Sequence, residues 1–296
     1  MAKAVGAEAF IAPLPSQPLT YSAEAIEALY RGRNADFPFR FISGMVMGAT
    51  SPATIAGSVV TANATAIAGI VLTQLIKPGA RVAASPQSYP QNMRSGLCDF
   101  GNIGESLHRA ASNQYWQRLG IPTLNICGYS NSKLIDFQCG YERTIQAVIA
   151  ALTGTDVIAQ GGAMYGELTL HPILMVLDND IAGMIGRFVE GIEVTDETLA
   201  LDLINEVGPI PGMYLDKEHT RKWWRKEQFM PKAADRLGIP EWLAKGKKSA
   251  IDYAQKRMEE ILATHKPAPL TPGQEAEIET ILEEAREYYR KKGMLK

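Results

Sequence analysis

Apolar positions along the chain fall into short runs that alternate with longer segments of helical spacing. Four short apolar runs predict strands, at residues 39–43, 81–85, 123–128 and 156–161. Residues 103–119 and 134–152 lie between these runs and have the spacing of helices. Strands that alternate with helices form a parallel sheet with right-handed crossovers, so the pattern predicts an α/β fold. Residues 173–177 fit either a fifth strand or the start of a helix.

The turn at residues 129–133 joins the third predicted strand to the helix predicted at 134–152. One broad face of that helix is apolar, through Ile135, Ile145, Val148, Ile149 and Leu152. Glu142 and Arg143 lie away from this face, which the pattern predicts to be the buried one. In an α/β sheet such a turn lies at the carboxyl end of a strand, where sites are built.

Residues 51–76 hold no charged residue and are long enough to cross a bilayer. Threonine, serine, asparagine and glutamine make the segment too polar for a single membrane span, and alanine and glycine recur along it. Small residues let a helix lie close to a sheet. We therefore predict a buried, tightly packed helix, with Ser51 as its cap and Pro52 at its first position.

The two ends of the chain differ from the alternating region. Residues 1–21 hold three prolines among small residues and predict a loop or arm. Further helices are predicted at residues 195–204, 220–230, 251–263 and 275–292. Trp223, Trp224 and Phe229 lie among basic residues, a mixture also found in nucleic-acid-binding segments, but a helix docked on the sheet-bearing domain explains them more simply.

The composition is that of a globular protein, with 46% hydrophobic residues and a formal net charge of −2. Because no basic excess is present, nucleic acid is not an expected partner, which leaves small molecules and proteins. Cys98, Cys127 and Cys139 lack metal-type spacing, so we predict packing roles for the cysteines and no metal site. Reduced cysteines and the lack of a secretion signal predict a cytoplasmic protein.

The residues that follow the predicted strands carry the candidate binding chemistry. They are Tyr89, Tyr129, Asn131, Lys133, Asp136, Gln138, Gln160, Met164 and Tyr165. The three tyrosines predict a pocket for a bulky organic cation, because each aromatic face attracts a quaternary ammonium by about 0.5–2 kcal/mol. Each tyrosine could instead serve packing. No nucleophile is placed beside a base, so no catalytic residue is assigned.

Polar residues near the third strand suggest specific contacts. Asp136 is favourable near a helix amino terminus, and it either pairs with Lys133 to hold the turn or leaves that lysine free. Gln138 and Glu142 are four residues apart and share a helix face.

Asp178 and Asp180 bracket Asn179 after an apolar run. They form either a paired-carboxylate site or acidic helix caps.

The run Ser130-Asn-Ser-Lys-x-x-Asp-x-Gln-x-x-Tyr-Glu142 resembles a segment of the trimethylamine methyltransferase superfamily, the MttB type. Other segments agree in order, at residues 48–57, 74–79, 177–181, 191–194 and 219–220. The resemblance runs from about residue 18 to about residue 269. Asn131 departs from the family pattern, which has aspartate there. His219 matches a family segment, which implies a place near the opening of the active site.

This resemblance implies a (β/α)8 TIM barrel, of which four strands make half. The chain is similar to the C-terminal portion of the family, with an arm at residues 1–21, a partial barrel at 22–215 and a helical region at 216–296. A half-barrel leaves two parallel strand edges unpaired. The edges are covered by the rest of a longer parent, by another subunit of a homo-oligomer, or by a partner chain.

The resemblance also implies an activity. Family members move a methyl group from a methylated amine to the Co(I) of a separate corrinoid protein, so we expect cobalamin as methyl acceptor on a partner and no tightly bound cofactor. The trimethylamine enzymes carry pyrrolysine, and its absence here favours a quaternary amine such as glycine betaine, whose carboxylate could pair with Lys133. The alternatives are a non-catalytic half-barrel scaffold of a methyltransfer assembly and a betaine-binding module.

Overall fold

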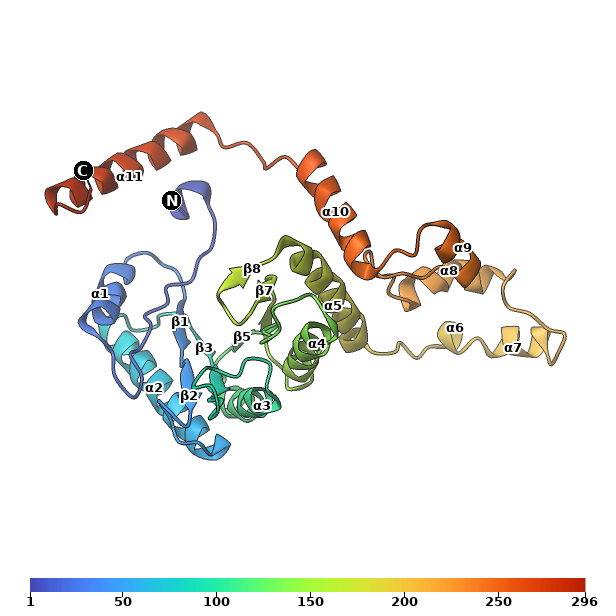
Figure 1. Cartoon of the computed structure of the whole chain (residues 1–296), viewed down its shortest axis with the longest axis horizontal. Coiled ribbons are helices and arrows are strands. Elements are labelled where there is room, and N and C mark those ends of the chain that lie inside the picture. Colours follow the sequence, from blue (N-terminus) through green and yellow to red (C-terminus); the bar gives the residue numbers. More distant parts are fainter. Residues whose placement is uncertain (296) are drawn as a thin grey trace.

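The computed structural model describes residues 1–295, and its helices and strands confirm the α/β class (Figure 1). The strands are β1 (Phe39–Ile42), β2 (Met45–Met47), β3 (Val82–Ser85), β4 (Ser88–Pro90), β5 (Leu124–Ile126), β6 (Val157–Ala159), β7 (Ala163–Met164) and β8 (Thr169–Leu170). The helices are η1 (Lys3–Val5), α1 (Ala23–Gly32), α2 (Ile55–Ile76), α3 (Ile103–Arg118), α4 (Phe137–Leu152), α5 (Pro172–Glu190), α6 (Asp196–Leu199), α7 (Leu201–Val207), α8 (Glu218–Glu227), α9 (Ile239–Ala244), α10 (Ala250–Thr264) and α11 (Pro272–Lys291).

Four parallel strands form the sheet in the order β1, β3, β5, β6. β1 pairs with β3 and β5 pairs with β6, both in parallel. A parallel bridge between Ala84 and Thr123 joins the two pairs. β2 and β4 continue β1 and β3 after a short break and also pair in parallel, whereas β7 and β8 form an antiparallel hairpin. All four predicted strands are therefore present, and their order in the sheet follows their order in the sequence.

Both outer edges of this sheet are largely open. Ile11 of the N-terminal arm pairs with Phe39, so the arm covers only the start of the β1 edge. Between residues 1 and 295 no strand pairs with the outer edge of β6, and no closed barrel forms.

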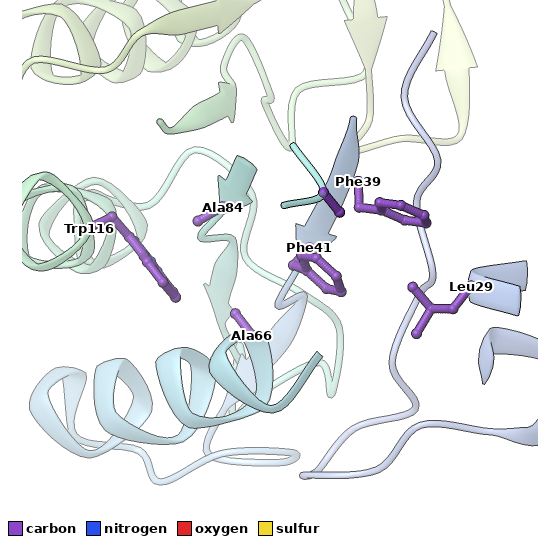
Figure 2. Packing of buried hydrophobic residues seen from close by; sticks show 7 residues of the cluster. Leu29, Phe39, Phe41, Ala66, Ala84 and Trp116 are labelled. Carbon is purple, nitrogen blue, oxygen red and sulfur yellow. The ribbon is translucent and has the colours of Figure 1, made fainter. Parts of the chain in front are cut away.

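Helices α2, α3, α4 and α5 follow one another along one side of the strands (Figure 1). The core between helices and sheet contains Leu29, Phe39, Phe41, Ala66, Ala84 and Trp116 (Figure 2). Successive strand residues point to opposite faces of a sheet. Because Phe39 and Phe41 pack into this core, Arg40 and Ile42 face the side away from the helices.

The charge-free segment forms helix α2, which begins at Ile55 and not at the predicted cap, Ser51. The prediction was wrong because Ser51 belongs to the turn that closes β2, where its N–H donates to a strand carbonyl. A Cβ on Gly69 would lie 2.6 Å from the Phe41 ring, so one side of α2 packs as closely as predicted. The opposite side, with Leu75, is exposed. Of the helices in the described part, α2 alone has a length and composition that would suit a membrane span.

Helix α4 presents to the core the face that the sequence predicted to lie outside. Glu142, Arg143 and Gln146 are buried, whereas Ile145 and Leu152 are 42% and 63% exposed. The prediction was wrong because apolar spacing takes no account of polar partners. Buried polar groups are tolerated where hydrogen bonds compensate them, and each of these three side chains has such partners.

Residues 173–177 form part of helix α5 and not a fifth strand. Asp178 and Asp180 therefore lie within a helix, and neither caps it as the sequence suggested. Asp180 accepts hydrogen bonds from the backbone N–H groups of Lys232 and Ala233, at 3.0 and 2.7 Å. It thus ties the segment after α8 to α5.

The helices predicted after residue 195 are present, but the three aromatic residues predicted to dock differ in their burial. The predicted helix at residues 195–204 is broken at Ala200, whose φ of 50° is left-handed. Trp223 is buried, with lysines of its own helix beside its ring, whereas Trp224 is 37% exposed, contrary to its predicted burial. The Phe229 ring lies against Gly183 of α5.

The buried His108 of α3 makes stability depend on pH in mildly acidic solution. Neither ring nitrogen has a hydrogen-bond partner within residues 1–295, and burial lowers its pKa to about 4, an effect that the nearby Ser58 backbone offsets only in part. The unfolded chain binds this proton near pH 6.5, so folding stability is lost as the pH falls from about 6.5 through 4. The free energy of unfolding lost over this pH range is about 3 kcal/mol.

We expect His108→Leu to remove this loss, so that the variant gains stability relative to the unmodified chain between pH 6.5 and 4. Urea unfolding at several pH values measures the difference. His265→Leu, at an exposed position, serves as the matched control and should follow the unmodified chain. Parallel curves for His108→Leu and the unmodified chain would show that His108 titrates alike in both states.

Candidate functional site

Three aromatic rings meet at the carboxyl ends of the strands. Tyr89 lies in β4, Phe100 lies in the loop before α3, and Tyr129 follows β5. The ring centroids of Tyr89 and Phe100 are 4.6 Å apart, and that of Tyr129 lies 5.8 Å from Tyr89 and 5.6 Å from Phe100. Such tilted and edge-on contacts are the favourable arrangement of aromatic pairs. These three residues are the aromatic cluster.

The carboxylate of Glu167, in the β7–β8 hairpin, lies beside the aromatic cluster. The Tyr89 hydroxyl donates to Glu167 Oε1 at 3.3 Å, and the adjacent Gly166 lies against the Phe100 ring. Burial raises the pKa of Tyr89 and, with the nearby Glu167 charge, that of Tyr129. Both phenols therefore stay neutral at pH 7. Aromatic faces beside a carboxylate make a region that attracts cations.

The turn after β5 is fixed by Glu142 of α4. Its Oε2 accepts the Ser130 hydroxyl at 2.5 Å and the Asn131 N–H at 3.2 Å. Its Oε1 accepts from Gln138 Nε2 at 2.9 Å, which confirms the predicted shared face of Gln138 and Glu142. Asn131 Nδ2 donates to Asp99 Oδ1 at 3.0 Å and so joins this turn to the loop that carries the aromatic cluster.

A second buried anchor is the ion pair of Arg143 and Asp178, whose side chains are 1% and 3% exposed. Arg143 Nε donates to Asp178 Oδ1 at 3.0 Å, and Nη2 contacts the other carboxylate oxygen. Arg143 Nη1 also donates to the carbonyls of Gly128 and Ala163, while Asp178 accepts from the Gly162 N–H at 2.8 Å. One arginine thus joins β5, the hairpin and α5.

A third anchor lies beneath the aromatic cluster, on α3. Glu105 and Arg109 form a fully buried ion pair. Glu105 accepts the N–H of Gly101, next to Phe100, at 3.2 Å. Arg109 donates to Gln146, whose amide contacts both the N–H and the carbonyl of Tyr129. Burial raises the pKa of Glu105 to about 7, although the Arg109 charge acts in the opposite direction.

Cys127 and Cys139 are buried, as their predicted packing role requires. Burial raises the pKa of Cys127 to about 11 and also raises that of Cys139, so both remain thiols at pH 7. Throughout residues 1–295, no group of three or more His, Cys, Asp or Glu side chains is arranged to hold a metal ion.

Of the two alternatives for Lys133 and Asp136, the structure shows the one in which they do not pair. Asp136 caps α4, where it accepts the Cys139 N–H and the Ser132 hydroxyl, both at 2.9 Å. These two hydrogen bonds satisfy the Asp136 carboxylate. The Lys133 ammonium lies 4.7 Å from the centroid of the Tyr165 ring. Lys133 and Tyr165 thus make a contact of their own outside the aromatic cluster.

The remaining predicted residues are dispersed. Gln160 follows β6, and both of its amide atoms are buried without a partner in the described residues. Met164 is half-buried in β7. His219 lies on α8, where Nε2 is 3.3 Å from the Glu197 carbonyl and the ring lies beside Trp223. Figure 1 shows α8 beyond α5 and away from the strands, so the structure does not bring His219 to the aromatic cluster.

Sequence reasoning missed Phe100, Glu167 and the α3 ion pair. Phe100 and Glu167 come from a loop and a hairpin that do not directly follow a predicted strand. One signal was available for the ion pair, because Glu105 and Arg109 stand four residues apart on a predicted helix.

The chain matches known proteins over most of its length. A family model described as trimethylamine methyltransferase matches residues 14–288. Trimethylamine methyltransferase MttB of Methanosarcina barkeri is 30% identical over 276 residues, which are 93% of this chain and 55% of that protein. Glycine betaine methyltransferase of Desulfitobacterium hafniense (strain Y51) is 32% identical over 266 residues, 90% of this chain and 55% of that protein. The chain thus spans little more than half the length of these curated relatives.

Proposed function

The chain belongs to the trimethylamine methyltransferase family, and from this we propose that it moves a methyl group from a quaternary amine to the Co(I) of a corrinoid on a partner protein. The observation that supports this most directly is the aromatic cluster with Glu167 beside it. Aromatic faces and a carboxylate suit an ammonium cation that cannot donate hydrogen bonds. The sequence holds only ordinary residues, which supports a quaternary amine over trimethylamine.

The reaction places few demands on proton chemistry. In a quaternary amine the nitrogen already carries its charge, so the C–N bond breaks with its electron pair moving to nitrogen and a neutral tertiary amine leaves. The electron pair of Co(I) forms the new bond to the methyl carbon. Tyr89 and Tyr129 keep their protons at neutral pH and serve as neutral contact surfaces. The task of the chain is to hold the cation with one methyl group directed outward.

We further propose that the four parallel strands are half of a (β/α)8 barrel. Their order along the chain and the helices on one side of the sheet agree with this architecture. The open edges of β1 and β6 are where further strands would complete it. Those strands would come from a second copy, from another chain or from a further segment, and they would supply the opposite wall of the site.

Methyl transfer to free cob(I)alamin tests the proposed reaction. The purified chain is incubated with tetramethylammonium, choline, glycine betaine or trimethylamine, and both the Co(I) absorbance and the demethylated amine are measured. We expect transfer from a quaternary amine. Tyr129→Leu should lower kcat/KM by about 2- to 30-fold, the size of one lost aromatic–cation contact. Tyr115→Leu on α3, at a ring 37% exposed, is the matched control and should leave the rate unchanged.

The other outcomes separate the alternatives. Tight binding of a quaternary amine without transfer would contradict the enzyme and favour a betaine-binding module. Folded protein that neither binds nor demethylates any amine would favour a scaffold role in a methyltransfer assembly. Equal effects of the Tyr129 and Tyr115 substitutions would show that the cation is bound elsewhere.

A further inference from the structure

Among residues 1–295, Arg40 is a half-buried cation without a carboxylate partner. It lies in the middle of β1 and points to the face of the sheet opposite the helices, because its neighbours Phe39 and Phe41 fill the helix side. Its Nη2 donates to Ser85 Oγ at 2.9 Å, whereas its Nε is buried and has no hydrogen-bond partner within residues 1–295.

A half-buried guanidinium in this state is costly. Desolvation of a charge is compensated in folded proteins by an ion pair and by hydrogen bonds to all of its donors. The planar guanidinium has five N–H donors in a fork that matches a carboxylate, and Ser85 occupies one of them. The Ser85 hydroxyl itself donates to the Leu124 carbonyl at 2.6 Å, so Ser85 is held in place and cannot neutralise the charge. The unused donors favour an anion from outside the described chain.

The position of Arg40 relates it to the aromatic cluster. Its hydrogen-bond partner Ser85 ends β3, which β4 with Tyr89 continues. Ser85 also donates to Leu124 of β5, the strand that precedes Tyr129. Tyr89 also donates to Glu167, and the Glu167 charge helps to raise the pKa of Tyr129. The region therefore presents a carboxylate and aromatic faces for a cation, and a guanidinium for an anion. This arrangement of charges is complementary to a zwitterion that carries a quaternary ammonium and a carboxylate.

We propose that Arg40 binds the carboxylate of a betaine while the aromatic cluster holds its quaternary ammonium, so that the site selects betaines over amines without an acid group. This inference rests on the proposed function, because it adds a second contact to the same substrate. It assigns to Arg40 the role that the sequence suggested for Lys133. Lys133 is exposed and its ammonium lies over Tyr165, whereas Arg40 is half-buried and forms no ion pair within residues 1–295.

Calorimetric titration separates the two ends of the substrate. Glycine betaine carries both charges and tetramethylammonium carries only the cation, and each is titrated into the chain in the oligomeric state in which it purifies. We expect the unmodified chain to bind glycine betaine more tightly than tetramethylammonium. Arg40→Met should weaken glycine betaine binding by about 10- to 100-fold and leave tetramethylammonium binding unchanged. Arg40→Lys keeps the charge without the fork, so its affinity for glycine betaine should lie between those of the unmodified chain and Arg40→Met.

Arg33→Met, at an exposed arginine at the end of α1, is the matched control and should bind both ligands as the unmodified chain does. Thermal unfolding confirms that each variant is folded, and Arg40→Gln replaces Arg40→Met if the latter unfolds. An equal loss of both ligands on Arg40 substitution, or no loss of either, would overturn the role of Arg40. Equal affinity of the unmodified chain for both ligands would do the same and would favour a protein carboxylate as the Arg40 partner. Binding of neither ligand would instead contradict the proposed function.

Discussion

Replacing Arg143 by methionine is expected to lower the free energy of unfolding by about 3–5 kcal/mol, because the substitution leaves Asp178 as an uncompensated buried charge. The carboxylate would keep its bond from the Gly162 N–H but lose both guanidinium contacts. The carbonyls of Gly128 and Ala163 would lose their donor as well. Urea unfolding followed by circular dichroism measures the cost.

Two further variants show whether the cost arises from the unpaired charge. Arg143→Met combined with Asp178→Leu removes both charges and should recover part of the lost stability. Arg187→Met, also an arginine that joins α5 to another segment, breaks a more exposed ion pair with Glu227 and should cost about 0–1 kcal/mol. Similar costs for the Arg143 and Arg187 variants would mean that Asp178 is not held as a buried charge by Arg143 alone.

The strands and their order follow from the sequence because they depend on local patterns. Each apolar run is short, and the segments between the runs have helical length, so a parallel α/β sheet was the expected outcome. Helix boundaries were less certain. The start of α2 was misplaced because Ser51 and Pro52 suit both a helix cap and the turn that they form in the structure.

The orientation of α4 shows where pattern analysis fails. Apolar spacing assumes that charged residues face water, but Glu142 and Arg143 are compensated by partners from the turn after β5 and from α5. Those partners are separated from α4 in sequence, and Asp178 lies 35 residues beyond Arg143. A pattern within one helix holds no information about them.

The candidate site was predicted only as far as strand ends determine it. Tyr89 and Tyr129 follow neighbouring strands and do meet. Phe100 and Glu167 reach the same place through a loop and a hairpin, whose paths depend on contacts such as that of Gly166 with Phe100. His219 lies on α8, away from the strands, and its place near the opening of an active site stays a prediction (Figure 1).

Replacing Arg109 by methionine should also cost about 3–5 kcal/mol, but with a distinct dependence on pH. Burial already raises the pKa of Glu105 to about 7 in the presence of Arg109. Without the arginine charge this pKa rises further, so the folded variant binds the Glu105 proton more tightly than the unfolded chain up to a higher pH. Stability of the variant therefore falls as the pH rises through 7, by up to about 1.4 kcal/mol per pH unit. Urea unfolding should show a larger cost at pH 8.5 than at pH 6.

The α3 ion pair also positions the aromatic cluster, through Gly101 on one side and through Gln146 and Tyr129 on the other. Arg109→Met should therefore weaken tetramethylammonium binding by the folded protein. The control is Leu29→Ala, which removes about 2–5 kcal/mol from the hydrophobic core, where Leu29 packs, and leaves these hydrogen bonds intact. If both variants bind the cation equally well, the ion pair stabilises the fold without shaping the site. If the Arg109→Met cost is the same at both pH values, Glu105 does not carry the uncompensated charge.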